Sequence, residues 1–135
     1  MNKKALLLIY IVSSFVLINI FTKCGEKEEI LENPYVKIIN SFDNYKLTSI
    51  LINLKILKVP GDYLVPGDST DLKQVDPGNL LLVYDYININ NASDSSKFQK
   101  LYGAEIFPEL KQNYRYKIIL SGTPGDPTIQ VISCI

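Results

Sequence analysis

The sequence predicts an all-β domain at residues 35–135, folded as an antiparallel β-sandwich of six or seven strands. Apolar and polar residues alternate with a period of two in most of this region, which places alternate side chains on opposite faces of a sheet. Pro-Gly pairs beginning at Pro60, Pro66, Pro77 and Pro124 separate the alternating segments. Proline followed by glycine favours tight turns, and short strands separated by such turns are typical of a sandwich.

The first strands are expected at residues 35–42 (YVKIINSF) and 45–59 (YKLTSILINLKILKV). The second of these segments places four aliphatic side chains on one face, namely Ile50, Ile52, Leu54 and Ile56. Its opposite face is mostly polar, and its β-branched residues favour a strand over a helix. We therefore expect one long strand here, buried on one face.

The later strands follow the same pattern of alternation and turns. A short strand is expected at residues 69–75 (STDLKQV), followed by a strand within residues 79–90 (NLLLVYDYININ). The first half of the latter is apolar on both faces, which is typical of a central strand. Residues 90–100 (NNASDSSKFQK) are hydrophilic and are interpreted as a loop. The last two strands are expected at residues 113–122 (NYRYKIILSG) and 128–135 (TIQVISCI).

Charged residues within the predicted strands are expected to face water. In residues 113–122 the alternation directs Arg115 and Lys117 outward and their apolar neighbours inward. Asp85 interrupts an otherwise apolar strand, and we expect it to be solvated. If it were buried instead, Arg115 or Lys117 is the candidate partner for its charge.

The composition is that of one globular domain without histidine chemistry. The chain has 135 residues, of which 47% are hydrophobic and 21% charged, as is usual for a single folded domain. Histidine is absent, which excludes Ser-His-Asp and Cys-His catalysis and the common imidazole zinc sites. We therefore expect no enzyme, no catalytic residue and no cofactor.

The charge balance argues against nucleic acid as a partner. The chain has 14 basic and 14 acidic residues. Lys3, Lys4 and Lys23 precede Cys24, while no acidic residue does, so the chain from Cys24 onward would carry a net charge of −3. It contains no basic stripe that would bind a phosphate backbone.

The N-terminus is interpreted as a signal peptide at residues 1–23. The letters MNKK supply a positive n-region, and residues 5–21 (ALLLIYIVSSFVLINIF) form the apolar h-region. An uncleaved membrane anchor is one alternative, although seventeen residues are at the short limit for spanning a bilayer. Cleavage after Ser14 is another, and it would leave the apolar letters FVLINIF on the product.

The residues FTKC at positions 21–24 resemble a bacterial lipobox, and they are more similar to the relaxed lipoboxes of spirochaete lipoproteins than to the enterobacterial type. The resemblance implies that Cys24 becomes the first mature residue and carries acyl chains, such as palmitate, that bind it to a membrane. Residues 24–34 would then form a flexible tether. In the enterobacterial type, an aspartate directly after the lipidated cysteine is a retention signal. Gly25 occupies that position here, which favours the outer membrane, on its periplasmic or surface side.

Three segments between Leu47 and Gly122 resemble small bacterial β-sandwich lipoprotein domains: LTSILINLKI, LVPGDSTDLKQVDPGNLLLVYD and NYRYKIILSG, in this order. The resemblance lies in the succession of strands and Pro-Gly turns. It implies an immunoglobulin-like or transthyretin-like sandwich. Members of this group are typically uncharacterised, so the resemblance implies a fold and no specific activity.

Tyr86 and Tyr102 are the candidate binding residues, because they lie beside the predicted polar loop. Exposed rings there would stack on a sugar or a peptide. The competing interpretation makes the tyrosines core or sheet-face residues paired across strands. Cys134 is either a buried apolar residue, as free cysteines often are, or a site of intermolecular disulfide formation; we expect burial.

No metal site is predicted. Five aspartates lie in or near the turns: Asp62, Asp68, Asp71, Asp76 and Asp126. They would provide oxygen ligands for calcium if they converged, but their spacing matches no EF-hand or repeat loop. Aspartate beside Pro-Gly also serves the turn itself through backbone hydrogen bonds.

These observations favour a membrane-anchored, non-catalytic binding or assembly module of a bacterial envelope, with an envelope protein or glycan as its partner. Two alternatives stay open. One is a purely structural accessory subunit of an envelope complex. The other is a small hydrolase that works without histidine, through carboxylates, lysine or tyrosine.

Overall fold

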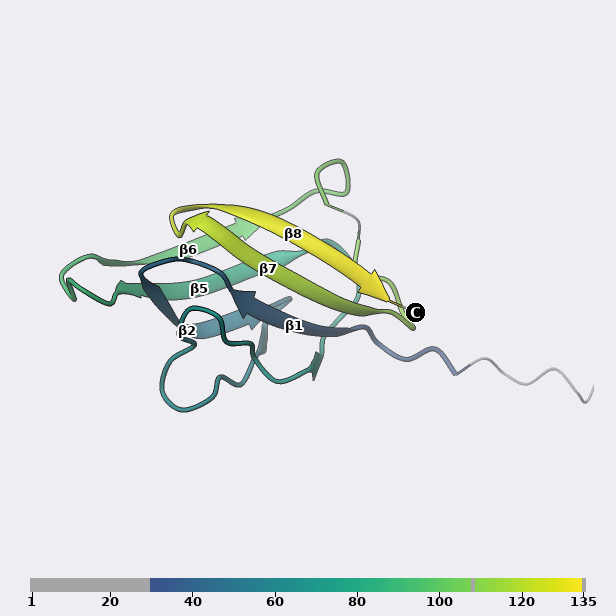
Figure 1. The fold of residues 1–135 in the computed structure, drawn as a ribbon. Coiled ribbons are helices and arrows are strands. Elements are labelled where there is room, and N and C mark those ends of the chain that lie inside the picture. The colour runs from purple at the N-terminus through teal and green to yellow at the C-terminus, as the bar shows by residue number, and fades with distance from the viewer. Residues whose placement is uncertain (1–29, 108, 135) are drawn as a thin grey trace, which may run out of the picture. The chain divides into compact units, whose positions relative to one another are not determined.

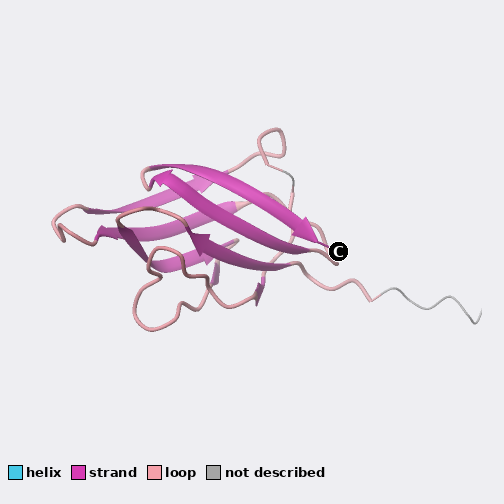
Figure 2. Ribbon diagram, viewed as in Figure 1, coloured by secondary structure: helices cyan, strands magenta, loops and turns pink. Residues whose placement is uncertain are grey.

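The computed structural model describes residues 30–107 and 109–134, and in that part of the chain it shows an all-β fold (Figure 1 and Figure 2). The strands are β1 (Tyr35–Asn40), β2 (Tyr45–Ile52), β3 (Lys55–Ile56), β4 (Lys73–Gln74), β5 (Leu81–Asn88), β6 (Ser95–Leu101), β7 (Arg115–Thr123) and β8 (Asp126–Cys134). They form two four-stranded sheets, in the orders β4-β1-β7-β8 and β3-β2-β5-β6. The prediction of two β-sheets is confirmed, and β3 and β6 are additional to the predicted strands.

The predicted signal peptide at residues 1–23, the predicted lipidation site Cys24 and the first part of the predicted tether lie outside the described residues. Near the start of the described part, Glu32 is hydrogen-bonded to the domain. Its amide N donates to Oδ1 of Asn113 at 2.8 Å, and its carbonyl accepts from the amide N of Asn113 at 2.8 Å. Among the described residues, no helix has the length and apolar character that a membrane span requires.

β1 and β7 are parallel, which corrects the prediction of a wholly antiparallel sandwich. The pairing is continuous from Tyr35 opposite Arg115 to Asn40 opposite Leu120. The chain leaves β1 for the other sheet and returns to β7 much later. Because no short hairpin joins these two strands, they are free to run in the same direction. The remaining strand pairs described are antiparallel.

The long strand expected at residues 45–59 is instead a hairpin of β2 and β3. Asn53 and Leu54 have φ angles of 47° and 65°, as both central residues of a two-residue type I′ turn require. The Asn53 side chain supports the turn, because its Oδ1 accepts a hydrogen bond from the amide N of Leu81 at 2.8 Å. Leu54 and Ile56, expected on the buried face, are therefore 74% and 68% exposed.

The loop expected at residues 90–100 is wrong over most of its length, because Ser95–Leu101 form β6. This strand pairs with β5 along its whole length, and Phe98 is its only buried side chain. The Phe98 ring stacks on Tyr84 with a centroid separation of 5.0 Å. A strand at a sheet edge with a single buried residue has no clear apolar alternation, so its sequence resembles that of a loop.

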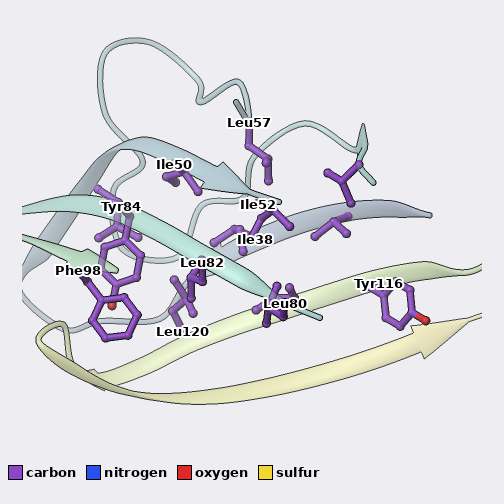
Figure 3. Close-up of a cluster of buried hydrophobic side chains, with 14 of the residues drawn as sticks. Ile38, Ile50, Ile52, Leu57, Leu80, Leu82, Tyr84, Phe98, Tyr116 and Leu120 are labelled. Atoms are coloured by element: carbon purple, nitrogen blue, oxygen red, sulfur yellow. The ribbon is translucent and has the colours of Figure 1, made fainter. Parts of the chain in front are cut away.

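The core lies between the two sheets (Figure 3). Leu82 and Tyr84 of β5 are fully buried, and β5 lies between β2 and β6, which confirms its prediction as a central strand. The Tyr84 hydroxyl donates to the carbonyl of Pro124 at 2.6 Å, so the core of one sheet is bonded to the β7–β8 turn of the other. Burial raises the pKa of Tyr84.

Candidate functional site

Three basic side chains gather on the outer face of the β4-β1-β7-β8 sheet. Val36 and Ile38 are buried, so Lys37 between them faces outward. In β7, buried residues alternate in the same way with Arg115 and Lys117, which confirms their predicted outward direction. The parallel pairing then sets Lys37 directly beside Lys117. Residues eighty positions apart in the sequence thus become lateral neighbours on one surface.

These side chains line an open hollow of about 340 Å³, which we call the basic hollow. Its lining residues are Lys37, Leu72, Arg115, Tyr116, Lys117 and Cys134. Leu72 precedes β4 and is 44% exposed, so it adds apolar surface beside the charges. Tyr116 borders the hollow from β7, but its ring lies on the core side, where its hydroxyl accepts a hydrogen bond from the amide N of Lys111 at 2.8 Å.

The electrostatics of the basic hollow favour an anion. Lys37 and Lys117 are neighbours, and like charges on adjacent strands repel each other. No carboxylate is among the described residues that line the hollow, and none of its cations forms an ion pair within the described part of the chain. The Arg115 guanidinium lies 5.8 Å from the Tyr35 ring centroid, a contact that leaves its charge in place. A bound anion would reduce the repulsion among these cations.

A second open hollow, of about 320 Å³, differs in its charges. Its lining residues are Asn33, Lys55, Lys73, Gln74, Val75 and Asp76. Nζ of Lys55 lies 3.8 Å from Oδ2 of Asp76. Such an exposed pair contributes little to stability, but it places a negative charge beside the positive ones. The basic hollow is therefore the better candidate site for an anionic ligand.

Cys134 is exposed, so the expected burial of this residue is wrong. It lies opposite Arg115 on β7, and its side chain is on the outer face of an edge strand rather than in the core. The strand was predicted, but which of its faces would be covered depends on the neighbouring sheet. The alternative role of Cys134 in an intermolecular disulfide stays a prediction.

Of the two candidate binding tyrosines, Tyr86 is partly buried and Tyr102 is buried. Tyr86 packs edge-to-face on Tyr45, with ring centroids 5.7 Å apart. Tyr102 is only 5% exposed and packs edge-to-face on Phe107, with centroids 4.7 Å apart. Burial is also the main reason that the pKa of Tyr102 is raised. The expected exposure of Tyr102 is therefore wrong, and the two rings do not form an exposed stacking surface.

A polar cluster fastens the β5–β6 turn. The Tyr45 hydroxyl and Nδ2 of Asn88 both donate to Oδ2 of Asp94, at 2.8 and 3.0 Å. The bond from Asn88, followed by the bond from Tyr45, lowers the pKa of Asp94, and the bond to this carboxylate raises the pKa of Tyr45. A carboxylate with a lowered pKa is a poor general base at neutral pH, so we interpret the cluster as structural.

The described residues contain no group of three His, Cys, Asp or Glu side chains placed to hold a metal ion. In the same part of the chain, every buried side-chain N or O atom has a hydrogen-bond partner. Asn40 is an example: its buried Nδ2 donates to the carbonyls of Tyr45 and Leu64, both at 2.8 Å. The core thus offers no unpaired polar group for a ligand to bind.

No family model, curated protein or solved structure matches the chain. The site is therefore defined by its own residues and geometry. The basic hollow combines positive charge with apolar surface and an open concave shape.

Proposed function

We propose that this protein is a membrane-anchored, non-catalytic binding module of a bacterial envelope, held by acyl chains on Cys24, on the outer membrane. In this proposal it is a small spirochaete-type lipoprotein whose sandwich is immunoglobulin-like or transthyretin-like. The lipobox-like residues FTKC and the apolar leader support the anchor. The two-sheet domain supplies the body that the anchor would hold at the membrane.

The basic hollow is the proposed binding surface. The single observation that carries this assignment is the lateral pairing of Lys37 with Lys117, beside Arg115, with no carboxylate among the described lining residues. The partner is an envelope protein or glycan that presents a carboxylate or phosphate next to apolar groups. Arg115 would bind such a group through two parallel hydrogen bonds, and the lysines would add point charges.

The non-catalytic role is supported by the chemistry of these side chains. The chain has no histidine, and the side chains that face the basic hollow are three cations, a thiol and a leucine, since the Tyr116 ring lies in the core. Cations of this kind attract and orient an anion, whereas general acid–base chemistry needs a group that titrates near neutral pH. Binding is the simpler use of this surface.

A pair of triple variants tests the binding surface. One removes the cations of the basic hollow: Lys37→Ala, Arg115→Ala and Lys117→Ala. The control removes three exposed lysines elsewhere: Lys58→Ala, Lys97→Ala and Lys100→Ala. With heparin as the glycan probe and poly-glutamate as the peptide probe, we expect calorimetric titration to show at least a tenfold loss of affinity for the first variant, or about 1.4 kcal/mol.

The control variant should change the affinity for the same probe by less than about twofold, because Coulomb attraction from separated surface charges is screened by salt. Equal losses in both variants would contradict the proposal, since net charge alone would then explain binding. Failure of the unmodified protein to bind either probe would contradict it as well. That second result would favour the purely structural accessory role.

The anchor is tested separately, by mass spectrometry of the protein purified from its native membranes. We expect the N-terminal peptide of the mature protein to begin at Cys24 and to carry acyl chains. An unmodified Cys24 would contradict the proposed membrane attachment. It would leave the binding surface on the sandwich unaffected.

A further inference from the structure

β6 and β8 are long sheet-edge strands whose outer sides no other described segment pairs with. The outer side of β1 is covered, because the amide N of Thr70 donates to the carbonyl of Ile38 at 2.9 Å and β4 pairs beside it. The outer side of β2 is covered in the same way by a reciprocal pair of hydrogen bonds between Leu47 and Leu64. Figure 1 shows β8 in yellow along the outside of its sheet.

β8 has few of the features that usually prevent an edge strand from pairing, and Pro127 near its start is one of them. Its sequence DPTIQVISC contains one charged residue, Asp126, at its first position. Its register with β7 is continuous along the strand, without a bulge. Most of its remaining residues are β-branched or hydroxylated, which suits them to a sheet. An edge of this kind is available to another strand.

The register identifies the backbone groups that face this edge. The two-residue turn at Pro124–Gly125 makes Thr123 and Asp126 the hydrogen-bonded pair that closes the β7–β8 hairpin. Because this bonding alternates along an antiparallel ladder, the N–H and C=O groups of Ile129, Val131 and Ser133 point away from β7.

The backbone of Pro127 also faces this edge, because it lies two residues before Ile129 in the same alternation. This agrees with the rule that proline, lacking an N–H, occupies edge-facing positions. In the described part of the chain, these edge-facing groups of Ile129, Val131 and Ser133 form no backbone hydrogen bond with another segment. The outer side of β8 therefore offers a row of free donors and acceptors.

We propose that β8 pairs antiparallel with β8 of a second copy of this chain, about a two-fold axis at Gln130. This axis sets all nine residues of the strand opposite a residue of the second copy. Pro127, which has no N–H, can accept but not donate a hydrogen bond in its pair with Ser133 of the second copy. Ile129 then exchanges two backbone hydrogen bonds with Val131 of the second copy, and Gln130 lies opposite Gln130 of the second copy in a pair without hydrogen bonds. The β4-β1-β7-β8 sheet of one copy and the same sheet of the second copy become one sheet of eight strands. The pairing does not require the proposed ligand, but it brings Asp126 of the second copy beside Cys134 and Arg115 of the basic hollow.

The charges favour a second copy over an unrelated strand. Asp126 and Cys134 lie on the outer face of the sheet, at opposite ends of β8, and Cys134 is beside Arg115. Antiparallel pairing places Asp126 of the second copy next to Cys134, in the same row as Arg115. The acidic end of each strand thus approaches the basic end of the other, and symmetry forms this contact twice. No like charges on the two β8 strands oppose each other.

Disulfide crosslinking of the full chain tests the axis directly. In a background of Cys24→Ser and Cys134→Ser, Gln130→Cys should form disulfide-linked dimers under mild oxidation. Opposed residues of a non-hydrogen-bonded pair have Cα atoms about 4.5 Å apart, within the range of a disulfide. The matched control is Gln99→Cys, an exposed glutamine on the β6 edge. We expect the β8 thiol to crosslink at least tenfold faster.

The register has its own test in the same background. Thr128→Cys and Ile132→Cys should each crosslink poorly alone and readily when mixed, because Thr128 lies opposite Ile132 of the second copy in this pairing. Crosslinking of either variant with itself, at the rate of the mixture, would overturn the axis at Gln130.

A charge exchange tests association without thiols. Gln130→Lys should weaken dimerisation at least tenfold in sedimentation equilibrium, because it opposes two like charges. Mixing it with Gln130→Glu should restore the dimer. Each single variant should keep the circular dichroism spectrum of the unmodified protein, since Gln130 is exposed. A protein that stays monomeric at millimolar concentration, with Gln130→Cys no faster than Gln99→Cys, would overturn the proposal and leave the edge to a strand of another protein.

Discussion

β6 and β8 are both uncovered edge strands of similar length, but they attach to the sandwich in different ways. β6 has one buried side chain, Phe98, and its other side chains are exposed, two lysines among them. β8 has no fully buried side chain, and Ile129 and Val131 pack partly buried against the core. β6 thus combines one buried anchor with a charged edge, whereas β8 is held by several partly buried contacts and presents an edge suited to pairing.

The largest loss of stability is expected when the buried anchor of β6 is removed, compared with a partly buried residue of β8. Phe98→Ala removes the stacked ring against Tyr84 and leaves a cavity, which should lower the free energy of unfolding by about 3 kcal/mol. Val131→Ala removes less apolar surface from a half-buried site and should cost about 1 kcal/mol. Urea unfolding at neutral pH measures both. Equal losses would show that β6 is not held mainly by its one buried residue.

A smaller effect, which depends on pH, concerns the stability of the β5–β6 turn that precedes β6. In the β5–β6 turn the folded pKa of Asp94 is lower than the ordinary pKa of an aspartate, so the unfolded chain takes up the proton first as the pH falls. The stability that Asp94 contributes is therefore present above about pH 4 and is lost as the pH falls through the folded pKa. Asp94→Asn should destabilise the protein at pH 7 and less so near pH 2.

The measurement is urea unfolding of the unmodified protein and of Asp94→Asn at both pH values. The control is Asp62→Asn, an exposed aspartate in a loop far along the chain from this turn. A difference between Asp94→Asn and the unmodified protein that does not shrink with acid would contradict the role of the Asn88 and Tyr45 hydrogen bonds.

The smallest effect on stability concerns the charged edge of β6. Lys97 lies opposite Asp85 on β5, and Lys97→Thr should cost about 0.5 kcal/mol, as expected for one exposed cross-strand pair. Self-association should nevertheless increase, because an edge charge that opposes pairing is lost. Light scattering during refolding measures this increase. If scattering stayed at the level of the unmodified protein, the lysine would not be what distinguishes β6 from β8.

The candidate site was predictable from the sequence only in part. Alternation placed Arg115 and Lys117 outward, and Lys37 occupies the same position in the similar run Lys-Ile-Ile of β1. No local pattern indicates that β1 and β7 are neighbours and parallel. The expected exposure of Tyr102 is wrong because Phe107 and Lys100 cover its ring. These contacts, too, have no signal in the local alternation pattern.

Local sequence patterns were sufficient to predict the all-β class, the central position of β5 and the outward direction of the β7 charges. These follow from alternation with a period of two and from Pro-Gly turns, which act over a few neighbouring residues. Four features are evident only in the folded chain: the β2–β3 hairpin, the strand at Ser95–Leu101, the parallel pairing and the exposed Cys134. The hairpin turn is local, but its positive φ angles fall on Asn53 and Leu54 rather than on a glycine. The other three features depend on which distant segment supplies hydrogen bonds or covers a face, and the packing of two sheets settles that choice.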